Sequence, residues 1–197
     1  MKKSDFLYRE LLYGVLEQKK TAFTQLSLSQ TLGISLSTAN LALRPLGKIG
    51  AVSIGHMGFR VTDAEKIAVY WSGRRNLAGD VIYKTRADLQ VSEIEKNMPD
   101  GTIYAAYSAY RLRFNDVPAD YSEVYAYAGF PVLEELRLRF PPRKGPPNVF
   151  VLASDPHLSR LCLDGISPLG QVYADLWNLG EWYATDFLRA LRERLAW

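Results

Sequence analysis

The chain has 197 residues, of which 48% are hydrophobic and 23% charged, both ordinary shares for a globular protein that buries its own core. No apolar run is long enough to span a bilayer, and Lys2-Lys3 leads straight into an amphipathic segment, so we expect neither membrane association nor a signal peptide. The single cysteine, Cys162, excludes an internal disulfide and a multi-cysteine metal site. We therefore expect a cytoplasmic protein.

The net charge of +3 is unevenly distributed along the chain. Residues 1–75 hold 11 Lys or Arg and 5 Asp or Glu, which gives +6, whereas residues 76–197 hold 13 and 16, which gives −3. A basic stretch is typical of phosphate-binding surfaces, although solvated surfaces of this charge are also common. Phosphate binding is therefore expected in the first part rather than the second.

The first part predicts three helices in succession. Leucines at helical spacing indicate a helix over residues 4–19. A second helix is expected over residues 23–32, with Thr24 as its N-cap and Gly33 in the left-handed conformation that ends it. Ser35 is expected to cap a third helix, whose inward-facing residues are Ala39, Leu43 and Leu46.

A hairpin and a fourth helix follow. Strands are expected over residues 51–54 and 59–62, a helix after the N-cap Asp63, and a linker over residues 72–76. Two short helices around a glycine turn, followed by a hairpin, are the layout of a winged helix-turn-helix, which places its second short helix in the DNA major groove. The first part is therefore expected to bind double-stranded DNA.

The third helix and its neighbours supply the candidate DNA contacts. On its outward face, Asn can pair with adenine, Arg with guanine, and Ser or Thr with phosphate or either base, while Leu can touch a thymine methyl group. Basic residues after the first helix and residues of the hairpin are expected to meet phosphates or the minor groove. The expected DNA-binding residues are Ser35, Ser37, Thr38, Asn40, Leu41, Arg44, Lys48, His56, Arg60, Lys19 and Lys20. A protein-interaction module without DNA binding is the alternative interpretation of the same pattern.

Pro45 lies inside the expected third helix. Proline lacks a backbone donor and costs about 3 kcal/mol in a regular helix interior. The helix is therefore expected either to kink at Pro45 or to end near Leu43 and restart as a turn. Because a kink would change the approach of Arg44 and Lys48 to DNA, the residues before them are the stronger candidates for base contacts.

Residues 76–197 mix strands and helices, which predicts an α/β (α+β) domain. Strands are expected over residues 81–85, 102–106, 123–127, 137–140 and 149–152. Helices are expected over residues 92–98, 108–114, 131–136, 169–177 and 182–195. The proline-rich residues 141–147 are expected to form a projecting loop.

Motifs of both parts resemble known families. The helix-turn-helix, its GKIGAV exit and the hairpin resemble the winged-helix domain of bacterial and archaeal transcription regulators. The segments YAAYSAYRLRF and SEVYAYA, and the closing SPLGQVYADLWNLGEWYATDFLRALRERL, resemble the C-terminal domain of the AbiEi antitoxins of type IV toxin–antitoxin systems and of related archaeal regulators. The family's closing Gln, Tyr and Asp-Leu correspond to Gln171, Tyr173, Asp175 and Leu176. This resemblance implies a DNA-binding autorepressor with a degenerate nucleotidyltransferase-like second domain that is generally not catalytic, and a toxin-like protein partner. No cofactor is expected.

The residues of the second part argue against nucleotidyl transfer. A working nucleotidyltransferase has a Gly-Ser turn and two strand carboxylates one residue apart, which hold two metal ions. Ser108 follows Ala106-Tyr107 where the Gly-Ser turn would be, and Asp120 and Glu123 would face opposite sides of a strand. With only two histidines, a His-based metal site is also not expected. We therefore expect no catalytic and no metal site; a nucleotidyltransferase-like enzyme positioned on nucleic acid is the alternative.

The sequence thus predicts a sequence-specific, DNA-binding transcriptional regulator. Residues 1–75 are expected to form the winged helix-turn-helix, and residues 76–197 a mixed-sheet, nucleotidyltransferase-like domain with C-terminal helices that dimerises or binds a partner or ligand. A homodimer is expected, because two-fold proteins double their groove contacts on palindromic sites.

Overall fold

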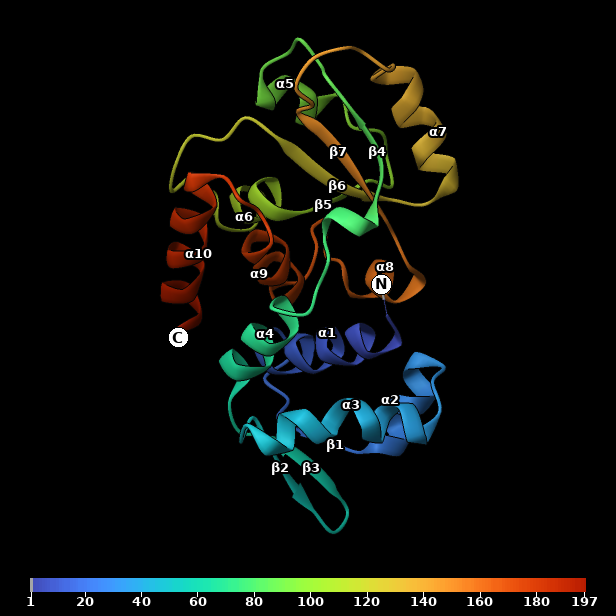
Figure 1. Ribbon diagram of the computed structural model, residues 1–197, viewed down its shortest axis with the longest axis vertical. Coiled ribbons are helices and arrows are strands. Elements are labelled where there is room, and N and C mark those ends of the chain that lie inside the picture. Colours follow the sequence, from blue (N-terminus) through green and yellow to red (C-terminus); the bar gives the residue numbers. More distant parts are fainter. Residues whose placement is uncertain (1) are drawn as a thin grey trace. The chain divides into compact units, whose positions relative to one another are not determined.

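The computed structural model describes residues 2–197 and has an α+β fold (Figure 1). The chain divides into two compact units, of which the first ends at Arg75 and the second comprises Asn76–Ala196. The first unit contains a three-stranded sheet and the second a four-stranded sheet. Among residues 2–197, no helix has both the length and the apolar character needed to cross a bilayer.

Four helices and a small sheet form the first unit. The helices are α1 (Lys3–Leu16), α2 (Gln25–Leu32), α3 (Leu36–Lys48) and α4 (Ala64–Ser72), and the strands are β1 (Ala22–Phe23), β2 (Val52–Gly55) and β3 (Gly58–Val61). Apolar side chains at helical spacing meet in one core, to which the first three helices contribute Leu7, Leu11, Leu28, Leu32, Ala39, Leu43 and Leu46.

The turn between α2 and α3 is built by the expected residues. The Thr24 hydroxyl accepts a hydrogen bond from the Ser27 amide at 3.1 Å and caps the start of α2. Gly33 ends α2 with a φ of 58°, in the left-handed region. The Ser35 hydroxyl then accepts from the Thr38 amide at 3.0 Å and caps α3. These local signals therefore fix the junction of the two helices.

Helix α3 continues through Pro45 to Lys48, so the alternative of an end near Leu43 is wrong. The amide that proline lacks would have donated to the carbonyl of Leu41, four residues earlier. The Leu41 side chain is 58% exposed, so water can reach this side of the helix and hydrate that carbonyl. Arg44 therefore remains on the same helix as the residues before it.

The sheet of the first unit has the order β1-β3-β2, and both pairs are antiparallel. Gly55 pairs with Gly58, which leaves His56 and Met57 as a two-residue turn. The expectation that a helix begins at Phe23 is wrong, since Phe23 lies in β1. It pairs there with Phe59, and the two rings stack with their centroids 5.8 Å apart.

The second unit has more helices around a four-stranded sheet. The helices are α5 (Val91–Lys96), α6 (Ala106–Phe114), α7 (Phe130–Arg139), α8 (Pro156–Leu161), α9 (Leu169–Trp177) and α10 (Trp182–Leu195). The strands are β4 (Val81–Thr85), β5 (Ile103–Tyr104), β6 (Val124–Ala128) and β7 (Val149–Ala153). The strand order is β4-β7-β6-β5, with β6 and β7 parallel and the outer pairs antiparallel.

Alternation along the strands separates the two faces of this sheet. On one face, Val124 of β6 and Val149 of β7 belong to a core cluster with residues of α5 and α7. On the other face, Tyr125 contacts Tyr107 of α6, and Tyr127 hydrogen-bonds to Asp175 of α9. Figure 1 shows α5 and α7 apart from the group of α6, α9 and α10, with the sheet between them.

Residues 137–140 do not form the expected strand, because α7 extends to Arg139. Two ion pairs at helical spacing, Arg137–Glu134 at 2.8 Å and Arg139–Glu135 at 2.5 Å, follow its exposed face. The expected strand over residues 102–106 is shortened to β5, since α6 begins at Ala106. The loop expected over residues 141–147 contains no strand or helix.

Candidate nucleic-acid interface

The outward face of α3 carries five of the eleven predicted contact residues. At about 100° per residue, the exposed members lie within an arc of about 100° on one side of the helix. They are Ser37, Asn40, Leu41, Arg44 and Lys48. The opposite side is buried and consists of Ala39, Ala42, Leu43 and Leu46. The helix therefore divides into a core face and a solvent face, as its sequence predicts.

The electrostatics of this region are one-sided. The sequence has no Asp or Glu between Glu17 and Asp63, a stretch that contains α2, α3 and the hairpin. The same stretch contains five cations, Lys19, Lys20, Arg44, Lys48 and Arg60. Within residues 2–197, no ion pair or side-chain hydrogen bond engages Arg44 or Lys48, so both remain available to an anionic partner.

Asn40 is the only outward amide on α3, and no described residue hydrogen-bonds to its side chain. It lies one turn before Arg44 on the same face. An amide can pair bidentately with adenine and a guanidinium with guanine, so the two side chains together suit the edges of bases in a major groove.

Ser35 and Thr38 are less available than the rest of the predicted set. Their hydroxyl oxygens are 2.9 Å apart and hydrogen-bond to each other, and the Ser35 hydroxyl also caps α3. Thr38 is half-buried. The structure therefore gives both residues a role at the start of α3 in addition to any contact with DNA.

The two lysines after α1 are engaged locally. The Lys19 ammonium donates to the Leu16 carbonyl at 3.0 Å, at the end of α1. The Lys20 ammonium lies 5.1 Å from the centre of the Phe23 ring, a cation–π contact at the edge of the small sheet. Both residues are exposed, so they add positive charge beside the hairpin.

The hairpin separates His56 from Arg60. His56 is exposed at the turn, whereas Arg60 lies on the central strand β3. Arg60 pairs with Ser53, two positions along the hairpin from the Gly55–Gly58 pair that flanks the turn. The Arg60 guanidinium donates to the Thr21 hydroxyl at 2.8 Å, which holds it over the sheet rather than at the tip. Of these two residues, His56 therefore lies at the exposed tip of the hairpin and Arg60 does not.

A hollow of about 620 Å³ lies between the hairpin and the start of α2. Its lining includes the cations Lys20 and Arg60 and the hydroxyl residues Thr24, Ser27, Ser53 and Thr62. No carboxylate lines it. The hydroxyl residues are absent from the set predicted from the sequence. The absence of acidic residues from 18 to 62 is the sequence signal that could have indicated them.

The positions compared with a nucleotidyltransferase lie apart from strand interiors. Ser108 is buried on α6, while Asp120 is exposed and Glu123 immediately precedes β6. The Glu123 carboxylate accepts hydrogen bonds from the hydroxyls of Ser122 and Tyr183. Among residues 2–197, no three His, Cys, Asp or Glu side chains come together in a group that could hold a metal ion.

Burial governs the titration of the tyrosines around Glu123. Burial, with a further contribution from the hydrogen bond to Glu123, raises the pKa of Tyr183 to about 12. The pKa of Tyr107 is also raised, first by burial and then by the nearby Glu181 carboxylate, to which its hydroxyl donates at 3.3 Å. These hydroxyls therefore stay protonated at neutral pH.

Comparisons of the chain with models of protein families, with curated proteins and with solved structures found no match. The functional proposal therefore depends on the geometry and charge of the first unit.

Proposed function

We propose that the first unit is a winged helix-turn-helix that binds double-stranded DNA, and that the protein is a sequence-specific transcriptional regulator. One observation carries the proposal: a segment without carboxylates folds so that Asn40, Arg44 and Lys48 project unpaired from one face of α3. With 13 residues, α3 is about 20 Å long, and a major groove about 12 Å wide admits such a helix.

The remaining predicted contacts fit supporting roles on the same duplex. Lys19 and Lys20 increase the positive charge that meets phosphates, and the hydroxyls of the hollow beside the hairpin supply further phosphate donors. His56 lies at the exposed turn, where a wing reaches an adjacent groove. Phosphate contacts of this kind orient the protein, while Asn40 and Arg44 select the sequence.

The test is selection of bound sequences from a random duplex pool with the full chain, followed by a salt titration on the selected duplex. A protein with three to five phosphate contacts should show a slope of log K against log salt of about −3 to −5. Enrichment of one motif together with such a slope supports the proposal. Absence of enrichment, or an affinity independent of salt, would favour the protein-interaction alternative.

We further propose that the regulator binds as a homodimer. A two-fold dimer requires a palindromic site whose half-sites are separated by about 10 base pairs or a multiple. The selected motif reports this symmetry directly, and sedimentation of the chain with and without the duplex reports the stoichiometry. A single asymmetric half-site bound by one chain would contradict the dimer and leave DNA binding intact.

The resemblance to the AbiEi antitoxins extends the proposal to autorepression and to a toxin-like protein partner. Autorepression requires that the selected motif occur in the DNA that precedes the protein's own reading frame. Binding to that DNA, and loss of binding when the motif is scrambled, would support it. Absence of the motif from that DNA would exclude autorepression, and the protein would then be proposed to regulate other genes.

A further inference from the structure

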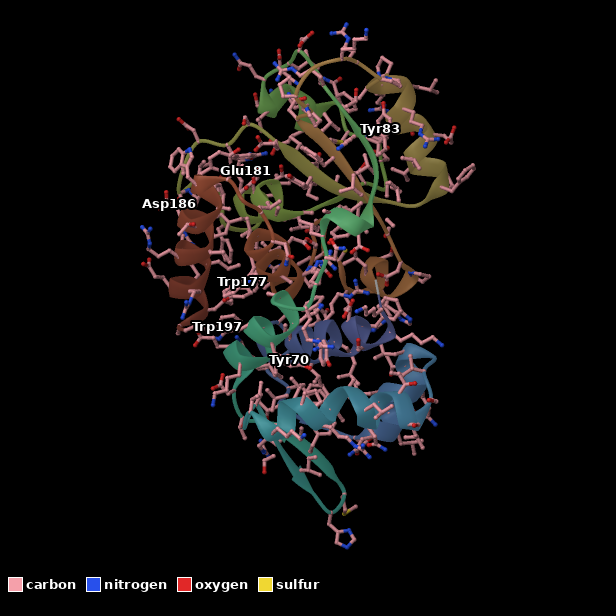
Figure 2. The ribbon with its side chains drawn as sticks, viewed as in Figure 1. Tyr70, Tyr83, Trp177, Glu181, Asp186 and Trp197 are labelled. Atoms are coloured by element: carbon pink, nitrogen blue, oxygen red, sulfur yellow. The ribbon has the colours of Figure 1, made fainter. Side chains whose placement is uncertain are left out.

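The second unit contains a hollow of about 240 Å³ on the sheet face that bears Tyr125. It lies over β4, β7 and β6 and is closed on one side by the turn between α9 and α10. Glu181 lies at that turn, immediately before α10 (Figure 2). All of the lining residues belong to this unit, and among them are Leu77, Val81, Lys84, Tyr125, Phe150 and Glu181.

Two aromatic rings form the floor of the hollow. Tyr125 and Phe150 pair in register across β6 and β7, and their rings stack with centroids 4.6 Å apart at an angle of 7°. Lys84 of β4 pairs with Phe150 on the other side. The three side chains therefore form a row across three neighbouring strands, with strands about 4.8 Å apart.

Opposite charges lie at two sides of this floor without neutralising each other. The Glu181 carboxylate accepts a hydrogen bond from the Tyr107 hydroxyl at 3.3 Å, which anchors it beside the rings. Its negative charge contributes to the raised pKa of Tyr125, whose first cause is burial, so the carboxylate is close to that ring. Lys84 is exposed, and within residues 2–197 no ion pair joins it to Glu181 or to another carboxylate.

We propose that this hollow binds a free α-amino acid with an apolar side chain. Its ammonium group lies at Glu181, where the carboxylate accepts a charge-assisted hydrogen bond. Its carboxylate lies at Lys84. Its side chain packs against the apolar rim, which Leu77 and Val81 contribute. This binding is independent of the proposed DNA binding.

A small zwitterion matches the hollow better than a ligand of one charge. A simple cation would be attracted to the Glu181 carboxylate but repelled by the Lys84 ammonium. A simple anion would be attracted to Lys84 but repelled by Glu181. A ligand with both charges satisfies both residues, and its apolar part covers the partly exposed side chains of Val81 and Phe150. The volume of about 240 Å³ is below that of sites for drug-sized ligands, as expected for a single amino acid.

The experiment is calorimetric titration of the full chain with L-leucine, L-methionine and L-phenylalanine, each up to about 10 mM, a range that detects millimolar dissociation constants. Each amino acid is compared with its N-acetyl derivative, which lacks the ammonium group, and with its amide, which lacks the carboxylate. We expect at least one free amino acid to bind, and both capped derivatives to bind about tenfold or more weakly. Absence of binding by all three, or equal binding of the capped forms, overturns the proposal.

Two variants test which side chain binds the ammonium group of the amino acid and which binds its carboxylate. Glu181→Gln keeps an acceptor for Tyr107 and should abolish the preference for the free amino acid over its N-acetyl form. Lys84→Gln should abolish the preference over the amide. Glu193→Gln and Lys144→Gln change the same charges at exposed positions outside the hollow and should retain both preferences. Equal losses in the control variants overturn the assignment, and the comparison of capped ligands on the unaltered chain holds even if a variant fails to fold.

Discussion

Gly58 lies against the backbone of Phe23 so closely that a β-carbon at Gly58 would be 2.4 Å from the Phe23 carbonyl oxygen. Gly58 also has a φ of 153°, a conformation that other residues rarely adopt. Phe23 belongs to β1, which pairs with β3 of the hairpin. Glycine at this position therefore allows the third strand to join the hairpin.

Gly58→Ala should destabilise the first unit by about 1–3 kcal/mol, because the added methyl group meets backbone that has no free rotamer to move. Gly55→Ala is the matched control, since its β-carbon would be 3.8 Å from the nearest atom and its φ is not positive. Urea unfolding of both variants measures their free energies of unfolding, which are then compared. Equal stability of the two variants would contradict the close approach of Gly58 to Phe23.

Arg44→Ala should weaken binding to the selected duplex by about 1–3 kcal/mol and relax the preference at one base position. Lys48→Ala should instead weaken binding to all duplexes and reduce the salt slope by about 1, because a lysine at a phosphate carries no sequence information. Competition titrations with matched and mismatched duplexes at several salt concentrations separate the two effects.

Lys66→Ala is the control for these variants. Lys66 lies on α4 rather than on α3, and its ammonium is 3.5 Å from Asp63. Replacing Lys66 by alanine should leave the preference for the matched over the mismatched duplex unchanged. If Arg44→Ala behaves in the same way as Lys66→Ala, then Arg44 does not contact a base.

Pro45→Ala should stabilise the first unit. Alanine restores the amide that can donate to the Leu41 carbonyl, and the gain is offset in part because proline also restricts the unfolded chain. We expect a net increase in the free energy of unfolding of about 1–2 kcal/mol. Because Arg44 already lies on a continuous helix, affinity for the selected duplex should change by less than about twofold. A loss of stability would show that the packing of the proline ring outweighs the missing hydrogen bond.

Local signals predict the helices of the first unit well, and long-range pairing explains the errors. Thr24, Gly33 and Ser35 each act on neighbouring backbone, so their roles are visible in the sequence. Strand β1 depends on pairing with β3, more than 30 residues later in the chain, which no local pattern encodes. Residues 137–140 alternate as a strand does, yet they complete α7, because a short segment of four residues fits both periods.

The residues of the DNA-binding face and of the hollow in the second unit also divide into those that local sequence predicts and those that depend on long-range pairing. Asn40, Arg44 and Lys48 could be predicted because helical spacing alone puts them on one face of α3. The contact between Arg60 and Thr21 could not, since it requires the pairing of β3 with β1. The hollow of the second unit also depends on register, because it assembles residues from three strands that are distant in the chain.

The stability of the second unit should fall at alkaline pH. Burial raises the pKa of Tyr183 to about 12 and also raises the pKa of Tyr107 and Tyr125, whereas tyrosine in an unfolded chain titrates near about 10. As the pH rises, the unfolded state loses these protons first, so its free energy falls relative to that of the folded state. The stabilisation is therefore complete below pH of about 10 and is lost as the pH rises toward about 12.

Tyrosinate absorbance and urea unfolding between neutral pH and pH of about 12 test this dependence. The buried tyrosines should ionise together with unfolding rather than before it. Tyr183→Phe removes one of the coupled protons and should make the alkaline loss of stability shallower. Ionisation of all tyrosines near pH of about 10 in a protein that remains folded would contradict the role of burial.

Tyr127→Phe should destabilise the second unit, because the Tyr127 hydroxyl belongs to a buried cluster with Gln171 and Asp175. The hydroxyl donates to the Asp175 carboxylate at 2.8 Å and accepts from the Gln171 amide at 2.8 Å. All three residues are fully buried, so removing the hydroxyl leaves polar groups without water to replace it.

The expected cost is about 1–3 kcal/mol in the free energy of unfolding, measured by urea titration. Tyr125→Phe is the control from the same strand, since no described residue hydrogen-bonds to the Tyr125 hydroxyl, and it should cost less than about 0.5 kcal/mol. Gln171 and Asp175 are also residues of the closing sequence pattern. If Tyr127→Phe costs no more than Tyr125→Phe, this cluster does not stabilise the fold, and the pattern needs another physical explanation.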